Sequence, residues 1–293
     1  MPNLTDIAAV RELCARHGFT LSKGFGQNFI VNPGVCPKIV ESAGIDETYG
    51  VLEIGPGVGV LTKELAQRAR KVVAVEVDER LPPLLEETLA GLDNVKVVLG
   101  DVLKVDLAAL IREEFPDMPV AVCANLPYYI TSPILMKLLE EKLPIQHITV
   151  MVQKEAAQRI TAAPSTREAG AISYAVAYYA KPKMLFSVQP GSFLPPPKVV
   201  SAVIQLEVRP QPAVQTPDEQ GYFRLIRAAF GQRRKTVANA ASAGLGLPKA
   251  QVTAALEAAG LPPLARPEQL TLEDFLALQQ ALSAQSKTPQ QDA

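Results

Sequence analysis

Short apolar runs, rich in β-branched residues, recur along the first half of the chain. They cover residues 51–54, 72–77, 95–99, 120–123 and 148–152. Runs of this length and composition are typical of buried parallel strands. Helical spacing lies between them: Val60, Leu61 and Leu65 share one helix face. This alternation predicts an α/β domain with a doubly wound, mostly parallel sheet and right-handed crossovers, preceded by a helix over 4–17.

The pattern changes near residue 209. Two more strands are predicted over 184–188 and 201–208, and then the sequence RPQPAVQTP at 209–217 indicates a linker, because proline stiffens the chain and removes backbone donors. Beyond it, helical spacing returns at 219–230, 249–259 and 267–282. We therefore expect a catalytic domain over 1–208, a small all-helical domain over 218–283, and a disordered polar tail over 284–293.

Composition excludes several classes of protein. Hydrophobic residues are 48% and charged residues 20% of the chain, a globular mixture, and the longest apolar stretch, near 171–180, is shorter than the roughly 20 residues of a membrane-spanning helix. Three scattered cysteines form no disulfide framework, which indicates a reducing, cytoplasmic location. The two histidines are too far apart in sequence to suggest a zinc site or a histidine-based triad, so we expect no metal.

A glycine-rich turn follows the first predicted strand. It reads Glu53-Ile54-Gly55-Pro56-Gly57-Val58-Gly59 and precedes a helix, so its backbone can approach a cofactor at the carboxyl edge of the sheet. A dinucleotide fingerprint would need a third glycine at position 60, where the chain has Val60. NAD is therefore disfavoured, and Gly55 and Gly57 are candidates for contact with another cofactor.

Carboxylates stand at the ends of the strands that surround this turn. Glu76 and Asp101 end the second and third strands, where they can bind the ribose and adenine of an adenosine. With Glu53 and Asp78 they form an acidic environment that suits a sulfonium cation better than a pyrophosphate. S-adenosylmethionine fits both requirements.

The fourth strand ends in Asn125-Leu126-Pro127-Tyr128. An amide oxygen and a backbone carbonyl can together accept hydrogen bonds from one exocyclic amine, and a tyrosine ring can stack on the base. This segment therefore predicts a binding site for an adenine amine.

Six motifs together resemble the ribosomal RNA adenine N6-dimethyltransferases. They are FGQNF (25–29), EIGPGVGVLT (53–62), NLPY (125–128), QKE (153–155), FLPPPKVVSA (193–202) and QRRKT (232–236). The resemblance extends over residues 18–275 and is strongest to the bacterial small-subunit enzyme, which dimethylates two adjacent adenosines in a hairpin loop near the 3′ end of 16S ribosomal RNA. It implies a Rossmann-like class I methyltransferase sheet with a helical C-terminal domain.

The resemblance also implies roles for individual residues. S-adenosylmethionine contacts fall on Asn28, Ile30, Gly55, Glu76, Asp101 and Asn125. The target adenine would be held by Asn125, Leu126, Pro127, Tyr128 and Phe193, with Phe193 closing over the base opposite Tyr128. One position departs from the family, which commonly has asparagine where this chain has Tyr129, and we assign that residue no role.

A basic segment is the expected RNA-binding surface. Residues 221–240 are predicted to be helical and contain five cations and no acid: Arg224, Arg227, Arg233, Arg234 and Lys235. Lys154, Arg159 and Arg167 form a second candidate patch.

We weigh four functions. The leading hypothesis is dimethylation of 16S ribosomal RNA during small-subunit biogenesis, by a monomer that binds the small subunit or its precursor and no membrane. The alternatives are the resistance-type enzyme that acts on large-subunit RNA, a non-catalytic RNA-binding assembly factor, and an oxidoreductase. FLPPPKVVSA and QRRKT favour the first, and intact Asn125 and Tyr128 argue against a dead site.

Overall fold

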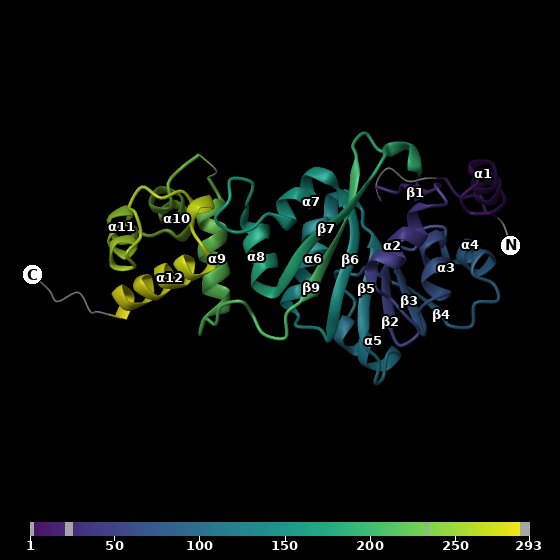
Figure 1. Cartoon of the computed structure of the whole chain (residues 1–293), viewed down its shortest axis with the longest axis horizontal. Helices are drawn as coiled ribbons and strands as arrows, with labels where there is room; N and C mark the ends of the chain where they lie inside the picture. The colour runs from purple at the N-terminus through teal and green to yellow at the C-terminus, as the bar shows by residue number, and fades with distance from the viewer. Residues whose placement is uncertain (1–2, 21–25, 233, 288–293) are drawn as a thin grey trace, which may run out of the picture. The chain divides into compact units, whose positions relative to one another are not determined.

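The structure is a computed structural model, and it describes residues 3–20, 26–232 and 234–287. The chain divides into two compact units (Figure 1). The first comprises Met1–Ala157 and Pro182–Val208, and the second comprises Gln158–Lys181 and Arg209–Ala293.

The first unit is built on a seven-stranded sheet in the order β4-β3-β2-β5-β6-β9-β7. The first five strands of this order are parallel to their neighbours, and β9 is antiparallel to β6. The bounds are β2 Gly50–Ile54, β3 Lys71–Glu76, β4 Val95–Leu99, β5 Val120–Asn125, β6 Ile145–Gln153, β7 Ala180–Val188 and β9 Ser201–Val208. The predicted doubly wound, mostly parallel α/β sheet is confirmed.

Helices connect the parallel strands, as buried parallel strands require: α3 Val60–Ala66, α4 Pro82–Thr88, α5 Leu107–Glu114 and α6 Thr131–Glu140. Helices α1 Ile7–Arg16 and α2 Val35–Ala43 precede β2, and α7 Lys154–Thr161 follows β6 and contains the boundary between the two units. The main core lies where α1 to α4 pack on β2, β3 and β5, with Ile39, Leu65 and Val72 buried at its centre. This packing fixes the carboxyl ends of β2, β3 and β5 relative to one another.

A two-stranded sheet forms a second layer of the first unit. Strand β1 (Phe29–Ile30) pairs antiparallel with β8 (Phe193–Leu194), so that Ile30 stands opposite Phe193. The sequence patterns predicted neither strand, because two residues are too few to show a period.

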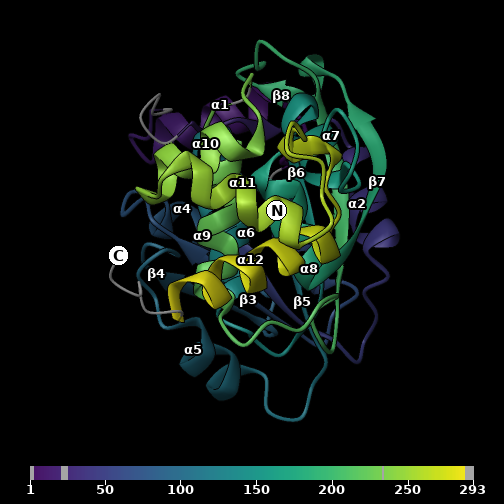
Figure 2. The same ribbon diagram turned by 90° about the vertical axis from the view of Figure 1, so that its left-hand side faces the viewer.

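The second unit is helical and has an aromatic core. Its helices are α8 Ala171–Tyr179, α9 Glu219–Phe230, α10 Val237–Leu245, α11 Lys249–Ala258 and α12 Leu272–Lys287, and Figure 2 shows the last four grouped together. The ring of Tyr174 lies 5.2 Å from that of Phe275, and the ring of Tyr178 lies 5.0 Å from that of Phe223. Each aromatic pair stabilises the fold by more than the burial of its apolar surface alone would.

The unit boundaries differ from the predicted domains in two respects. The division at Val208 coincides with the predicted start of the linker, but residues 158–181 group with the C-terminal helices. The reason is physical: Tyr174 and Tyr178 on α8 bury their rings against the aromatic residues of α9 and α12. Residues 284–287, which were predicted to belong to a disordered tail, are instead part of α12, and residues 288–293 lie outside the described residues.

The predicted basic helix over 221–240 is not continuous. Helix α9 ends at Phe230 with Gly231 as its C-cap, and α10 begins at Val237 with the Thr236 side chain as its N-cap. The connecting turn separates Arg234 and Lys235 from the helix that carries Arg224 and Arg227. These four cations therefore do not lie on one continuous helix.

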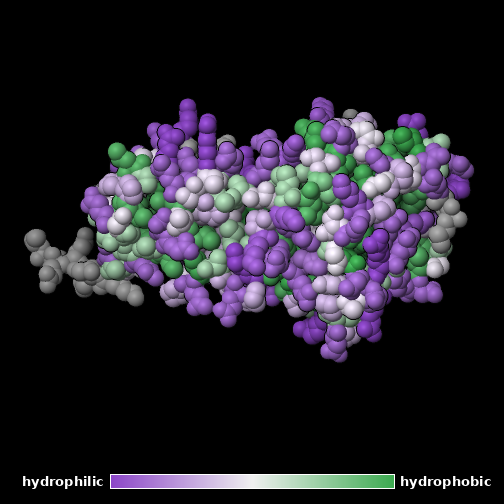
Figure 3. All heavy atoms as spheres, viewed as in Figure 1, coloured by the Kyte–Doolittle hydropathy of each residue, from purple (hydrophilic) through white to green (hydrophobic). Residues whose placement is uncertain are grey.

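No helix among the described residues is long and apolar enough to cross a membrane. On the face drawn in Figure 3, hydrophobic residues form scattered groups rather than one continuous area. The three cysteines are all free thiols.

Candidate active site at the carboxyl edge of the sheet

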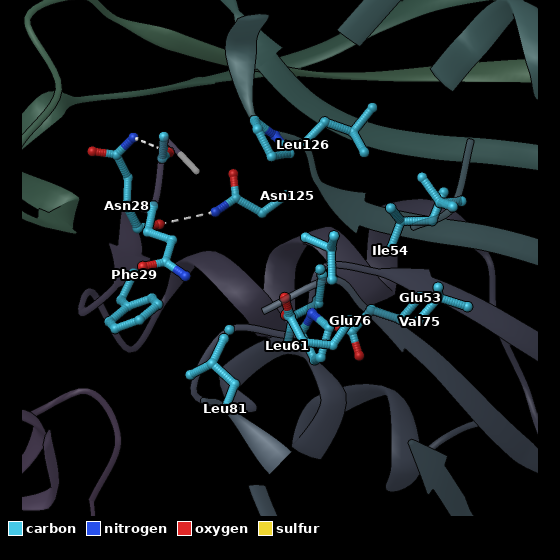
Figure 4. A pocket seen from close by; sticks show the side chains of 18 of the residues that line it. Asn28, Phe29, Glu53, Ile54, Leu61, Val75, Glu76, Leu81, Asn125 and Leu126 are labelled. Carbon is cyan, nitrogen blue, oxygen red and sulfur yellow. Dashed lines mark hydrogen bonds between the residues drawn. The ribbon is translucent and has the colours of Figure 1, made fainter. Parts of the chain in front are cut away.

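One pocket in the first unit gathers most of the predicted site residues (Figure 4). It lies where β2, β3 and β5 end. The predicted residues that line it are Asn28, Ile30, Gly55, Gly57, Glu76, Asp101, Asn125, Leu126, Pro127 and Tyr128. Residues separated by as many as 100 positions thus meet in one place, as expected at the carboxyl edge of a doubly wound sheet.

The glycine turn leaves its backbone open to this pocket. Gly55 has a φ of 70°, in the left-handed region, and a Cβ built on it would meet no heavy atom within 4 Å beyond its chain neighbours. Gly57 also has a positive φ, and there a Cβ would lie 3.2 Å from the Phe29 ring. The open space at Gly55 is suited to a ligand that approaches the main chain.

Two buried carboxyl groups border the pocket. Glu76 is 4% exposed, and its Oε1 accepts a hydrogen bond from the backbone N–H of Asp78 at 2.8 Å. Burial raises the pKa of Glu76, and burial likewise raises the pKa of Glu53 to about 8, against the opposing effect of the nearby Thr62 hydroxyl. Neither carboxyl oxygen of Glu53 has a hydrogen-bond partner in the described part of the chain. Buried carboxyls of this kind favour a cationic or hydrogen-bond-donating ligand.

Asp101 extends this wall beyond the end of β4. It is half-buried, its Oδ1 accepts a hydrogen bond from the backbone N–H of Leu103 at 3.0 Å, and Lys104 Nζ lies 3.5 Å from its Oδ2. The turn therefore fixes the carboxylate at the pocket.

Asp78 does not join this acidic group, contrary to the prediction. It is not among the residues that line the pocket, and its carboxylate binds Arg80 through two nitrogens, at 2.8 and 2.6 Å. The Arg80 guanidinium lowers the pKa of Asp78. The second oxygen also accepts from Gln27 Nε2 at 2.8 Å, so Asp78 anchors the segment that precedes Asn28.

Asn125 ends β5 with its amide held in one orientation. Its Nδ2 donates to the backbone carbonyl of Asn28 at 3.1 Å, and the side chain of Asn28 donates in turn to Gly26 O at 3.1 Å (Figure 4). Because the amide nitrogen is engaged, Asn125 Oδ1 is the atom left to accept a hydrogen bond from a ligand.

The backbone carbonyls of the motif are not equivalent. Pro127 O accepts hydrogen bonds from Ile130 N at 3.2 Å and from Thr131 Oγ1 at 3.3 Å. The backbone N–H of Leu126 donates to Met151 O, but its carbonyl oxygen accepts no hydrogen bond from the described residues. Leu126 O is therefore better suited than Pro127 O to accept from a substrate.

Tyr128 begins the 3-10 turn Tyr128–Ile130, is partly buried and lines the pocket. Its hydroxyl lies 2.6 Å from Ser201 Oγ, at the start of β9. Burial raises the pKa of Tyr128, and the hydrogen bond to Ser201 opposes that shift. The phenol is therefore a neutral, fixed group.

Phe193 is not where the prediction places it. It is 3% exposed, belongs to the main core, and does not line the pocket that contains Tyr128. Pairing of β8 with β1 explains the difference, because it packs the Phe193 ring into the core. In this structure Tyr128 and Phe193 do not form two walls of one pocket.

The predicted RNA-binding cations lie in the second unit. Arg224 and Arg227 are exposed on α9, and Arg234 and Lys235 are exposed in the turn that follows. Arg233, and Phe25 of the FGQNF motif, lie outside the described residues. Among the residues that the structure describes, no three His, Cys, Asp or Glu side chains are grouped to hold a metal ion.

Sequence reasoning missed two features of the site. It gave no role to Ser201, although Ser201 stands in the FLPPPKVVSA motif, and it treated Glu53 as one of several acids rather than as a fully buried carboxyl without a partner. A polar residue inside an apolar strand is the only signal that the sequence offers for either.

Comparison with known proteins identifies the family. The model of the family described as ribosomal RNA adenine dimethylase matches residues 18–283. The chain is 46% identical over 286 residues to the ribosomal RNA small subunit methyltransferase A of Streptococcus pneumoniae (strain P1031), covering 96% of this chain and 99% of that protein. The protein of the same name from Geobacillus thermodenitrificans (strain NG80-2) is also 46% identical over 286 residues, covering 94% and 97%.

Solved structures agree with this assignment. A dimethyladenosine transferase from Plasmodium falciparum superposes with a TM-score of 0.72 at 28% identity, covering 88% of this chain and 98% of that one. The 23S rRNA methyltransferase ErmE superposes with a TM-score of 0.64 at 30% identity, covering 87% and 100%. The chain belongs to the ribosomal RNA adenine dimethylase family of S-adenosylmethionine-dependent methyltransferases.

Proposed function

We propose that this chain transfers methyl groups to the N6 amines of two adjacent adenosines in the 3′-terminal hairpin loop of 16S ribosomal RNA, dimethylating each during small-subunit biogenesis. The observation that carries the proposal is Asn125, whose amide nitrogen is bound to Asn28 O and whose oxygen is left to accept a hydrogen bond at the pocket. The 46% identity to small-subunit enzymes over nearly the full chain supports the small subunit, against 30% identity to a large-subunit enzyme.

The pocket residues fit S-adenosylmethionine. The open backbone at Gly55 leaves room for the methionine portion, and Glu76 and Asp101 line the pocket where they can bind the ribose and the adenine. Asn28 and Ile30 line the same pocket. When bound, the cofactor supplies a methyl group on a sulfonium ion. A sulfonium ion beside the buried carboxyls of Glu53 and Glu76 would favour their ionised forms, which in turn attract its positive charge.

The substrate amine would be held by two acceptors. Asn125 Oδ1 and Leu126 O can each accept one of its hydrogens, which localises the nitrogen lone pair and turns it toward the methyl group. Because Pro127 O already accepts two hydrogen bonds, we assign the second acceptor to Leu126. No strong base is needed, and none of the pocket residues acts as one in this scheme.

Tyr128 provides the stacking surface for the target base. Extruding a base costs a few kcal/mol, whereas stacking on one aromatic ring contributes about 1–3 kcal/mol. Since Phe193 is buried, Tyr128 is the one aromatic ring of the predicted pair that the pocket presents. We keep Phe193 as a proposed contact only for a conformation in which its ring leaves the core.

The finer points of partner and location are also proposals. We propose that Arg224, Arg227, Arg233, Arg234 and Lys235 contact RNA phosphates, that the substrate is the small subunit or its precursor, and that the enzyme is a monomer in the cytoplasm. Exposure of the four described cations supports the first proposal, and three free thiols support a reducing compartment.

The test is methyl transfer from labelled S-adenosylmethionine to small ribosomal subunits that lack the modification, followed by mapping of labelled nucleotides. We expect dimethyladenosine at two adjacent positions near the 3′ end of the small-subunit RNA. Naked large-subunit RNA serves as the control. Label there would indicate the resistance-type enzyme, and tight RNA binding without label would indicate an assembly factor.

A further inference from the structure

Tyr129 is an exposed aromatic residue beside the active-site pocket. Its side chain is 61% exposed, and of the large hydrophobic residues that are exposed in the described part of the chain it is the only aromatic one. It follows Tyr128 directly within the 3-10 turn Tyr128–Ile130, so both rings come from a single turn of backbone. Its neighbours Pro127, Tyr128 and Ile130 line the pocket, whereas Tyr129 does not.

Gly26 supports the ring of Tyr129 from the other side of the pocket rim. A Cβ built on Gly26 would lie 3.3 Å from both Cδ1 and Cε1 of Tyr129. Gly26 has a φ of 61° and itself lines the pocket. The Tyr129 ring is therefore held against the main chain at the rim, with most of its surface facing solvent.

The charges near Tyr128 indicate what this rim binds. The hydroxyl of Tyr128 lies on Ser201, and the strand that carries Ser201 is joined to Lys154, whose backbone N–H donates to Val200 O at 2.9 Å. Lys154 and Lys198 are both exposed. An exposed aromatic ring and exposed cations on the segments next to Ser201 are the elements that bind single-stranded nucleic acid.

We infer that Tyr129 is a stacking subsite for the nucleobase adjacent to the target adenosine. This inference rests on the proposed function and deepens it. With one adenosine extruded onto Tyr128, its neighbour on the same strand is unstacked on one side and can stack on the ring at the rim. Stacking there offsets part of the extrusion energy, which Phe193 does not offset while buried. When the two adjacent adenosines exchange places, each serves as the neighbour of the other.

Three variants at one position separate stacking from other effects of the side chain. Tyr129→Phe keeps the ring, Tyr129→Leu keeps apolar bulk without a ring, and Tyr129→Ala removes both. On unmodified small subunits we expect Tyr129→Ala and Tyr129→Leu to lower kcat/KM by about 5- to 150-fold and Tyr129→Phe to stay within about twofold of wild type. Affinity for S-adenosylmethionine should be unchanged in all three, which verifies that each variant is folded.

A substrate change identifies the base that stacks. Subunits are reconstituted with an abasic nucleotide on the 5′ or the 3′ side of one target adenosine, and Tyr129→Ala should lose its penalty on one of the two. The inference is overturned if Tyr129→Ala matches wild type, if Tyr129→Leu performs as well as Tyr129→Phe, or if the penalty persists on both abasic substrates. If wild type itself transfers no methyl group to small subunits, the proposed function fails. In that case the affinity for the hairpin RNA tests the stacking subsite separately, and equal affinities of wild type and Tyr129→Ala would overturn it.

Discussion

The hydroxyl of Tyr128 and Oγ of Ser201 lie 2.6 Å apart, joining the first residue of a 3-10 turn to the first residue of an antiparallel strand. Ser201 is fully buried and stands opposite Gln153 in the register of β6 and β9. The ring of Tyr128 is therefore tied to the sheet at its far end. A ring held at both ends loses little further freedom when a base stacks on it.

The first prediction concerns this hydrogen bond. Tyr128→Phe and Ser201→Ala should each lower kcat on unmodified small subunits by about 2- to 10-fold, while the ring stays in place. This fold-change corresponds to the net free energy of one hydrogen bond, about 0.5–1.5 kcal/mol. The double variant should be no slower than the slower single variant, because both remove the same interaction. Additive losses would show that Ser201 acts on stability rather than on Tyr128.

The second prediction separates cofactor binding from chemistry. Asn125→Ala should abolish methyl transfer while leaving most of the affinity for S-adenosylmethionine. Glu76→Ala should weaken that affinity by about 10- to 150-fold, because hydrogen bonds to a charged group are worth about 1.5–3 kcal/mol. Calorimetric titration of both variants measures the difference, and equal loss of cofactor affinity would contradict the roles assigned.

The fold was more predictable from the sequence than the site. Each predicted strand of the sheet is present, because a buried strand such as β5 (Val120–Asn125) is apolar at every one of its buried positions, 120–124. Strand β1 was not predictable, since a two-residue pairing depends on tertiary contacts. Helix α9 (Glu219–Phe230) matches the helical spacing predicted over 219–230, whereas the basic helix predicted over 221–240 is interrupted after Phe230. Residues 158–181 join the second unit through ring contacts such as Tyr178–Phe223 and Tyr174–Phe275, whose members are 45 and 101 positions apart in the chain. No local pattern reveals such contacts.

Within the site, residue types were predictable and their surroundings were not. Asn125 and Tyr128 follow from the motif, but the partner of each, Asn28 O and Ser201 Oγ, comes from a distant segment. Phe193 shows the converse: an aromatic residue in a motif was expected at the base, yet pairing of β8 with β1 buries it.

The third prediction concerns Glu53 and pH. Its carboxyl is fully buried, and burial raises its pKa from 4.5 to about 8. Between these values the folded chain keeps a proton that the unfolded chain has released. The free energy of unfolding should therefore fall as pH rises through this window, by at most about 1.4 kcal/mol per pH unit from this group, and level off above it.

Denaturant titrations at pH 5, 6, 7 and 8 measure this contribution as the difference between wild type and Glu53→Gln. The amide cannot ionise, so the variant should gain stability relative to wild type as pH rises. Other groups that titrate near Glu53, namely Glu76, Cys36 and Cys123, are present in both proteins. Parallel pH profiles would show that Glu53 is not protonated in the folded state.

The fourth prediction tests whether α8 belongs to the helical unit. Phe275 is fully buried and its ring contacts Tyr174 of α8, so Phe275→Ala should destabilise this unit by about 3–5 kcal/mol. Hydrogen exchange should then accelerate in α8 together with α9 and α12, while β2 and β5 keep their protection. Unchanged exchange in α8 would place residues 171–179 with the first unit instead.

The fifth prediction concerns the basic residues near the end of α9. Each lost phosphate contact reduces the slope of log affinity against log salt by about 0.7–0.9. We expect Arg224→Ala with Arg227→Ala, and Arg234→Ala with Lys235→Ala, each to weaken RNA binding and to lower that slope by about 1 to 2. Lys249→Ala, which removes an exposed cation from the N-terminal end of α11, is the matched control and should change neither the affinity nor the slope.

Because phosphate contacts carry no sequence information, both pairs of substitutions should weaken binding to unrelated RNA hairpins as much as binding to the substrate hairpin. A loss confined to the substrate hairpin would instead indicate that these side chains contact bases.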